Sequence, residues 1–233
     1  MFQYRNSFLV VITLKTDLQH QWRNKHIEKG YGKFIYDGIV DLEEWAKSSK
    51  KVCFFLKEAY LKSDSEYGDL CEWLKDGNVK RMWHTVSDWV FALNKIEVSL
   101  IPSYNEIDDN ESERIKTISV VNIKKSEGYS NSKNDNLISF VEEDARFIKQ
   151  QIEDIAPKII VCGNTTYFFQ IAVGNEFKGF EINYDQLNLK GFFWAGDTLI
   201  IDFCHPANRF DRMGKYYAFA ALYQQALKEK GRL

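Results

Sequence analysis

The stretch IIDFCHPANR, residues 200–209, begins like a buried strand and ends in a histidine that is followed directly by a proline. Its apolar start is typical of a strand covered on both faces, as in parallel sheets. Proline restricts the backbone of the residue before it, so the chain leaves the strand in a defined direction. His205, Asn208 and Arg209 therefore stand at a rigid strand exit, where a site could form.

Three more apolar runs have this strand-like character, and helical patterns lie between them. The strands are expected over Val52–Leu56, Ile118–Ile123, Lys158–Cys162 and Leu199–Cys204. The helices, indicated by apolar residues at helical spacing, are expected over Arg81–Ile96, Leu137–Ile155 and Gly214–Lys230. This alternation favours an α/β fold, a three-layer α/β/α sandwich around a central four-stranded parallel sheet with right-handed crossovers.

The size and composition of the chain favour one domain. Its 233 residues are 45% hydrophobic and 15% aromatic, which is enough to bury a sizeable core without disulfides. Residues 1–233 are expected to form a single domain, with residues 1–50 as an N-terminal extension packed on it. The acidic segment 105–114 and the polar segment 126–136 are predicted to be irregular, and residues 179–196 to form a hairpin or an arm.

Charge and cysteine content narrow the possible partners. The net charge of −2 creates no general attraction for nucleic acid, so a polyanion site must be local. The four cysteines lack metal-site spacing and are expected to be free thiols in a reducing compartment. No metal and no cofactor are predicted. The apolar run Phe8–Ile12 is too short to span a membrane, so we expect a cytoplasmic monomer without a membrane partner.

Polar residues follow the predicted strands, and ligands of open parallel sheets bind at the carboxyl ends of the strands. Glu58 follows the first strand, Asn122 belongs to the end of the second, Gly163 and Asn164 follow the third, and His205 follows the fourth. Each residue alone is most simply a salt-bridge, turn, cap or structural residue. Together they form the set that a hydrolytic pocket for a flat polar ligand needs.

The four strand ends resemble, in order, the successive motifs of the uracil-DNA glycosylase superfamily. The motifs are FFLKEAY (residues 54–60), ISVVNIKKSEG (118–128), PKIIVCGNT (157–165) and DFCHPANR (202–209). The chain is also similar to a bacterial branch of that superfamily in which an element like DGIVDLEEW, residues 37–45, precedes the first strand. The resemblance implies a four-stranded parallel sheet flanked by helices and a pocket for a base flipped out of DNA.

The resemblance also implies roles for individual residues. Glu58 and His205 match the catalytic carboxylate and histidine, Asn122 matches the amide that reads the base, and Tyr60 or Tyr67 takes the place of the aromatic residue packed against it. Cleavage of an N-glycosidic bond develops positive charge on the sugar and negative charge on the base. A carboxylate suits the first charge, and a histidine hydrogen bond suits the second.

Basic and polar residues beside the strand ends are expected to contact single- or double-stranded DNA. They are Lys57, Lys124, Lys125, Gly163, Asn164, Asn208 and Arg209, with Lys62, Lys133, Arg212 and Lys215 nearby. Three interpretations stay open. The first is a glycosylase that removes uracil or a related damaged base. The second is an inactive member of the fold that binds nucleic acid or a modified nucleotide, suggested by the departures at Lys57 and Ala207 from the usual motifs. The third is an α/β enzyme acting on another small substrate.

Overall fold

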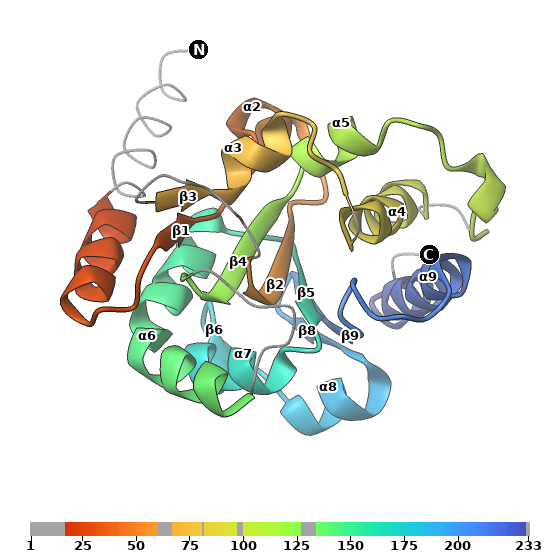
Figure 1. Ribbon diagram of the computed structural model, residues 1–233. Helices are drawn as coiled ribbons and strands as arrows, with labels where there is room; N and C mark the ends of the chain where they lie inside the picture. Colours follow the sequence, from red (N-terminus) through yellow and green to blue (C-terminus); the bar gives the residue numbers. More distant parts are fainter. Residues whose placement is uncertain (1–16, 60–66, 81, 97–99, 127–133, 232–233) are drawn as a thin grey trace, which may run out of the picture.

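The computed structural model describes residues 17–59, 67–80, 82–96, 100–126 and 134–231. A central sheet crosses the molecule, and helices cover both of its faces (Figure 1). The four expected strands are present as β2 (Val52–Glu58), β4 (Ser119–Lys124), β5 (Ile159–Gly163) and β9 (Thr198–Phe203). All four run parallel, in the order β4-β2-β5-β9. The prediction of an α/β fold with these parallel strands is confirmed.

The sheet has a fifth strand, which corrects the expected four-stranded sheet. Strand β8 (Phe192–Ala195) pairs antiparallel with β9. Ala195 lies opposite Thr198, so only Gly196 and Asp197 connect the two strands. Gly196 has a φ of +60°, which glycine adopts without strain in a two-residue hairpin turn. Such a short turn forces the antiparallel direction, since a parallel crossover needs a much longer connection.

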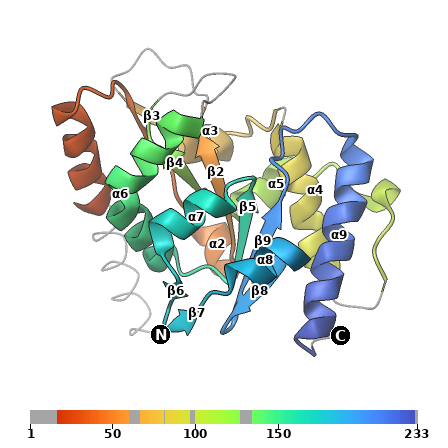
Figure 2. The same ribbon diagram turned by 90° about the horizontal axis from the view of Figure 1, so that it is seen from below.

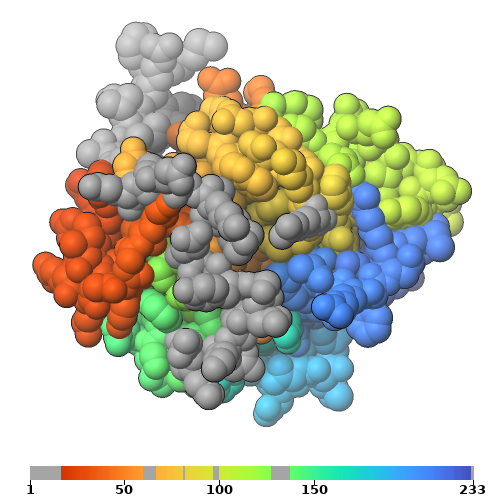
Figure 3. Space-filling view, viewed as in Figure 1, coloured from red at the N-terminus to blue at the C-terminus, as the bar shows by residue number. Residues whose placement is uncertain are grey.

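The helices form two layers with separate hydrophobic cores (Figures 1 and 2). One layer contains α4 (Met82–Lys95), α5 (Glu111–Lys116) and α9 (Arg212–Glu229). The other contains α6 (Asn134–Ile155), α7 (Thr166–Val173) and α8 (Tyr184–Lys190). The three predicted helices are thus confirmed as α4, α6 and α9. At the surface, the yellow and green segments that include α4 and α5 adjoin the blue C-terminal segment (Figure 3).

Short elements occupy the connections. They are β1 (Phe34–Tyr36), α2 (Leu42–Lys47), β3 (Tyr67–Asp69), α3 (Leu70–Lys75), the 3-10 helix η1 (Tyr104–Glu106), β6 (Glu176–Phe177) and β7 (Phe180–Glu181). Helices η1 and α5 correct the expectation of irregular structure over residues 105–114. Helix α8 likewise lies within the segment that was expected to be a hairpin or an arm. Helix η1 has three residues, α5 has six and α8 has seven. Such short helices show no clear helical period in the sequence.

The N-terminal extension adds a further layer beside β4. Residues 17–28 are helical, and residues 34–40 run antiparallel along the outer edge of β4. The N–H of Val40 donates to the carbonyl of Ile118 (3.0 Å), and the N–H of Val120 donates to that of Gly38 (2.8 Å). This pairing covers the edge strand, which would otherwise offer unpaired backbone groups to another chain. No helix among the described residues has the length and apolar character needed to cross a bilayer.

Candidate functional site

The register of the sheet brings Glu58 and His205 to the same level. Phe55 of β2 pairs with Cys162 of β5, and Cys162 pairs with Asp202 of β9. Glu58 lies three residues beyond Phe55, and His205 lies three residues beyond Asp202. Strand β5 lies between β2 and β9, so these two strands are about two strand spacings, or roughly 10 Å, apart. The two predicted catalytic residues therefore share the carboxyl edge of the sheet.

A cavity of about 360 Å³ lies at this edge. Its lining residues are Asn164, Cys204, His205, Ala207 and Asn208. They come from the turns that follow β5 and β9, and the volume falls in the range of small-molecule sites. Three of the predicted site residues, His205, Asn164 and Asn208, therefore meet at one cavity.

A hydrogen bond from the backbone determines the tautomer of the His205 imidazole. The N–H of Ala207 donates to Nδ1 of His205 (3.1 Å), so Nδ1 acts as the acceptor. The neutral ring then carries its proton at Nε2. Burial, followed by the positive charges of Lys57 and Lys215, lowers the pKa of His205 to about 4. At neutral pH the side chain is thus an uncharged Nε2–H donor.

Gly163, the last residue of β5, and Asn164, which follows it, allow the turns after β5 and β9 to approach each other at the cavity. A Cβ on Gly163 would lie 2.7 Å from Cδ2 of Leu56 and 3.3 Å from Cδ of Pro206, so only glycine fits without movement. Asn164 has a φ of +56°, which asparagine tolerates better than most residues. Its backbone N–H donates to the carbonyl of Phe203 (2.7 Å), and its exposed side chain lies at the cavity.

Glu58 is paired with a lysine from the neighbouring strand. Its carboxylate lies 3.3 Å from Nζ of Lys124, and the two residues are direct partners in the β2–β4 register. The Glu58 side chain is only 7% exposed. Lys124, which was expected to contact DNA, thus neutralises the predicted catalytic carboxylate. In addition, its ammonium lies 5.5 Å from the ring centre of Phe140.

Asn122 and Lys125 lie in a buried network away from the cavity. The side-chain amide and backbone N–H of Asn122 both donate to Oδ2 of Asp37, at 2.9 and 2.8 Å. Lys125 is 1% exposed, forms an ion pair with Asp37 and donates to Oε1 of Gln151 (2.9 Å). The expected DNA contact of Lys125 is thereby corrected, because its ammonium is buried and already bound. Asn122 is 2% exposed and does not line the cavity.

Of the two candidate tyrosines, Tyr67 is among the described residues, and it does not line the cavity. Tyr60 lies outside the described residues, as do Lys62 and Lys133. Tyr67 is 48% exposed on β3, where the Arg23 guanidinium lies 5.4 Å from its ring centre. Strand β3 pairs with β1 in a separate two-stranded sheet, so Tyr67 is set apart from His205.

An exposed loop, residues 207–210, leads from His205 into α9. The loop includes Arg209, which was expected to contact DNA, and Phe210, which is 72% exposed. The Phe210 N–H donates to Oδ1 of Asn208 (3.2 Å), which closes a local turn. Sequence reasoning missed Phe210. The signal that could have identified it is a large aromatic residue in a polar loop, between Arg209 and Asp211, directly after a predicted site.

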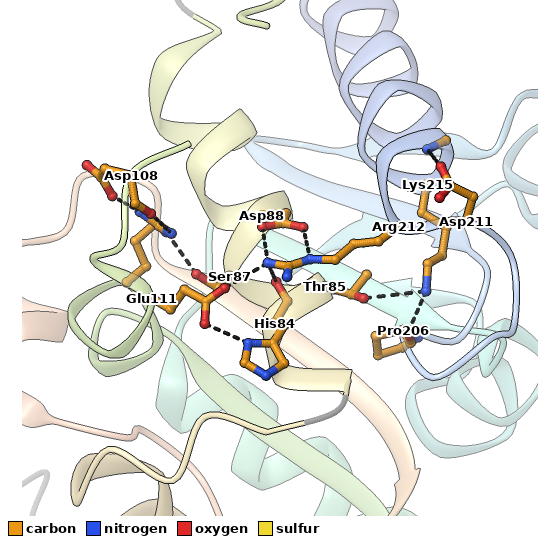
Figure 4. A network of polar contacts seen from close by, with 12 residues as sticks. His84, Thr85, Ser87, Asp88, Asp108, Glu111, Pro206, Asp211, Arg212 and Lys215 are labelled. Carbon is orange, nitrogen blue, oxygen red and sulfur yellow. Dashed lines mark hydrogen bonds and ion pairs between the residues drawn. The ribbon is translucent and has the colours of Figure 1, made fainter. Parts of the chain in front are cut away.

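A polar network anchors the first turn of α9 on α4 (Figure 4). The guanidinium of Arg212 donates to both carboxylate oxygens of Asp88, at 2.5 and 2.7 Å, and to Glu111 at 2.7 Å. Glu111 also pairs with Nδ1 of His84 (2.6 Å). Arg212 was expected to lie beside a DNA track, but its donors are directed into the protein. The sequence carried no local signal for this network, because its members are far apart along the chain.

A second, larger cavity of about 790 Å³ lies between α2, α3 and α6. Several carboxylates line it, but two of them serve the local fold. Asp41 caps α2 and pairs with Lys75 (3.1 Å), and Asp69 caps α3. None of the predicted catalytic residues lies there. No group of His, Cys, Asp and Glu side chains in the described part of the chain could hold a metal ion.

The cavity at His205 is therefore the best candidate for a functional site. No family model matches this chain, and no curated protein matches its sequence.

Proposed function

We propose that the protein is a DNA glycosylase that hydrolyses the N-glycosidic bond of uracil or a related base flipped out of DNA. The observation that carries the proposal is the state of His205. Its ring is neutral at neutral pH, bonded through Nδ1 to Ala207, and placed at a cavity with Nε2–H as its donor. The resemblance of the four strand ends to the uracil-DNA glycosylase motifs supports the same function.

The chemistry uses a hydrogen bond rather than full protonation. When the bond between C1′ and the base nitrogen breaks, its electron pair leaves with the base. The Nε2–H of His205 donates to the oxygen on which this negative charge collects. With a pKa of about 4, His205 at neutral pH stabilises the anion without carrying a charge of its own. Water then adds to C1′ and releases a proton to solvent, the base anion takes up a proton from solvent, and the carboxylate of Glu58 stabilises the sugar cation.

The surrounding residues suit a flipped nucleotide. The exposed amide of Asn164 lies at the cavity and offers a donor and an acceptor to the edge of a base. Arg209 meets a phosphate, and the exposed ring of Phe210 enters the gap that the flipped base leaves in the stack. In this arrangement Asn164 recognises the base, a role that the sequence resemblance assigned to Asn122.

The test measures base release from end-labelled DNA that carries uracil, hypoxanthine, xanthine or hydroxymethyluracil, in single and double strands. Alkali cleaves the strand wherever a base has been released. We expect release by the wild-type protein, loss of release in His205→Ala, and unchanged release in His20→Ala, which alters an exposed histidine. A folded wild-type protein that releases none of these bases would refute the proposal.

The ion pair of Glu58 favours a second candidate function, which is binding without catalysis. A carboxylate that is 7% exposed and bound to Lys124 is poorly placed to activate water. An inactive member of the fold would bind nucleic acid through its local basic groups, with affinity that falls steeply as salt increases. Fluorescence anisotropy with labelled single-stranded DNA at about 50 and about 200 mM salt measures this dependence. Binding that is insensitive to both salt and Arg209→Glu would rule this function out.

A further inference from the structure

Lys215 is a buried cation in the first turn of α9. It is 7% exposed, and its Nζ donates to the carbonyls of Pro206 (3.0 Å) and Asn208 (2.9 Å) and to Oγ1 of Thr85 (3.4 Å). An ammonium group has three N–H donors, whereas a neutral amine has two. The three acceptors therefore match the charged form. Figure 4 shows Lys215 extending from α9 between Thr85 and Pro206.

The two carbonyls bound by Lys215 belong to the turn that holds His205. Asn208 donates its N–H to the carbonyl of His205 (2.8 Å), and Ala207 donates its N–H to Nδ1 of the same residue (3.1 Å). The N–H groups of the turn thus fix His205, while carbonyls of the turn are held by Lys215. A change in the direction of these carbonyls would rotate the adjoining peptides, including the N–H that determines the tautomer.

The helix that carries Lys215 is itself held in place. Arg212, three residues earlier, makes a two-pronged contact with the buried carboxylate of Asp88 on α4. Asp211 caps α9 by accepting from the N–H of Gly214 (2.7 Å). Lys215 therefore reaches the turn from a rigid element, which is the condition for one side chain to position another.

We propose that Lys215 is a positioning residue of the candidate site, whose buried ammonium fixes the His205 turn and its Nε2–H tautomer and adds a positive charge beside the cavity. Its catalytic consequence rests on the proposed glycosylase function, because a leaving base anion would form next to this charge. The effect on His205 is independent of that function.

Two cations act on the imidazole of His205 from different elements, Lys57 from β2 and Lys215 from α9. Both disfavour the imidazolium form, in addition to burial. Lys215 also bonds the turn that holds the ring. Its removal should therefore change the tautomer as well as the pKa, whereas a lysine that acts by charge alone would change the pKa only.

The experiment follows His205 by NMR in ¹⁵N-labelled full-length protein, with its signals assigned by comparison with His205→Ala. In the wild type we expect a pKa of about 4 and the Nε2–H tautomer. In Lys215→Met the pKa should rise toward the ordinary value of 6.5, and the Nδ1–H tautomer should appear. Lys228→Met, on an exposed part of the same helix, should leave both unchanged. A folded Lys215→Met protein with an unaltered His205 would overturn the inference.

Lys215→Arg provides a second variant in case Lys215→Met does not fold. Arginine keeps the positive charge, but its planar fork cannot meet the same three acceptors. The pKa of His205 should stay low while the Nδ1–H tautomer appears. A tautomer ratio identical to that of the wild type would show that Lys215 does not position the ring.

Base release separates this inference from the proposed function. If the wild type releases uracil or another base, Lys215→Met should lower kcat by about 100-fold with little change in KM, as for loss of a preorganised stabilising group. If the wild type releases no base but His205 responds to Lys215→Met, the glycosylase proposal fails and the positioning role stands. If release occurs and kcat, tautomer and pKa are all unchanged in Lys215→Met, only the positioning role fails.

Discussion

His205 owes its chemical state to its environment. An imidazole in water has a pKa of about 6.5 and is partly charged near neutral pH, but burial and two nearby lysines lower the pKa of His205 to about 4. The N–H of Ala207 then determines which nitrogen carries the proton. Burial, two side-chain charges and one backbone hydrogen bond therefore convert an ordinary titrating residue into a neutral donor of fixed direction.

The lowered pKa of His205 predicts a pH dependence of stability. The unfolded chain takes up a proton near pH 6.5 and the folded protein only near pH 4, so stability is full above 6.5 and falls as the pH drops toward 4. Between about pH 7 and about pH 5, the wild type should lose about 1–2 kcal/mol more free energy of unfolding than His205→Asn. Urea unfolding at the two pH values measures this difference.

The exposed His20 supplies the control for that measurement. His20→Asn should lose as much stability between the two pH values as the wild type. Equal losses in the wild type and in His205→Asn would contradict the assigned state of His205.

At the scale of elements, the site depends on how closely β5 meets its neighbours. Gly163 is the last residue of β5, and the side chain of Leu56 and the ring of Pro206 both pack against it. The turn after β9 can therefore approach β5 only because residue 163 has no side chain. This contact joins the two turns that line the cavity.

Gly163→Ala should accordingly destabilise the protein by about 1–3 kcal/mol, since the new methyl group overlaps Leu56 and Pro206. It should also shift the NMR signals of His205. Gly214→Ala is the matched control, because its Cβ would lie an ordinary 3.6 Å from the nearest atom and alanine suits a helix. Thermal or urea unfolding of both variants checks the prediction, and equal effects on stability would refute it.

The contact between α4 and α9 leads to a second prediction at this scale. Asp88 is 1% exposed, and its burial raises its pKa even though Arg212 opposes the shift. Arg212→Leu should cost about 2–3 kcal/mol, because it removes the two-pronged arginine partner of a buried carboxylate. The double variant Asp88→Leu with Arg212→Leu should regain part of this loss. A double-mutant cycle by urea unfolding measures the coupling, and simple additivity would contradict it.

At the scale of the whole molecule, Asp37 joins the N-terminal extension to the sheet and to α6. Its carboxylate is bound by Lys125 and Asn122 from β4 and its continuation, and by Gln151 from α6. The segment around Asp37 also covers the edge of β4. The part of the extension around Asp37 thus belongs to the folded core.

Asp37→Asn should therefore destabilise the whole domain, by about 3–5 kcal/mol, because it leaves the buried ammonium of Lys125 without its counter-charge. Asp185→Asn changes an exposed aspartate on α8 and should have little effect. Urea unfolding should show a single transition that moves to lower urea in Asp37→Asn. A small loss confined to the N-terminal residues, as seen by hydrogen exchange, would show instead that the extension folds separately.

Local sequence patterns determined much of the architecture. Continuous apolar runs specified the four parallel strands, and apolar spacing specified α4, α6 and α9, because both signals arise from neighbours along the chain. The rule that ligands bind at the carboxyl ends of parallel strands then placed Glu58, Asn164 and His205 on one edge. The fifth strand depended on a two-residue turn, which is a weaker signal, so the sequence predicted only a hairpin or an arm over residues 179–196.

Only the tertiary structure decided which lysines are free to meet a ligand and which are internal. Lys125 and Lys215 look like surface cations in the sequence, yet both are buried. Each contacts partners that the local sequence pattern does not reveal. Lys125 finds Asp37, 88 residues away, and Lys215 finds Thr85, 130 residues away. Such pairs form only when distant segments pack, since burying a charge is tolerated only where partners for it come together. For that reason the sequence by itself indicated a candidate site at the carboxyl ends of the strands, and the packing of α9 on α4 showed which buried groups hold the turn that lines it.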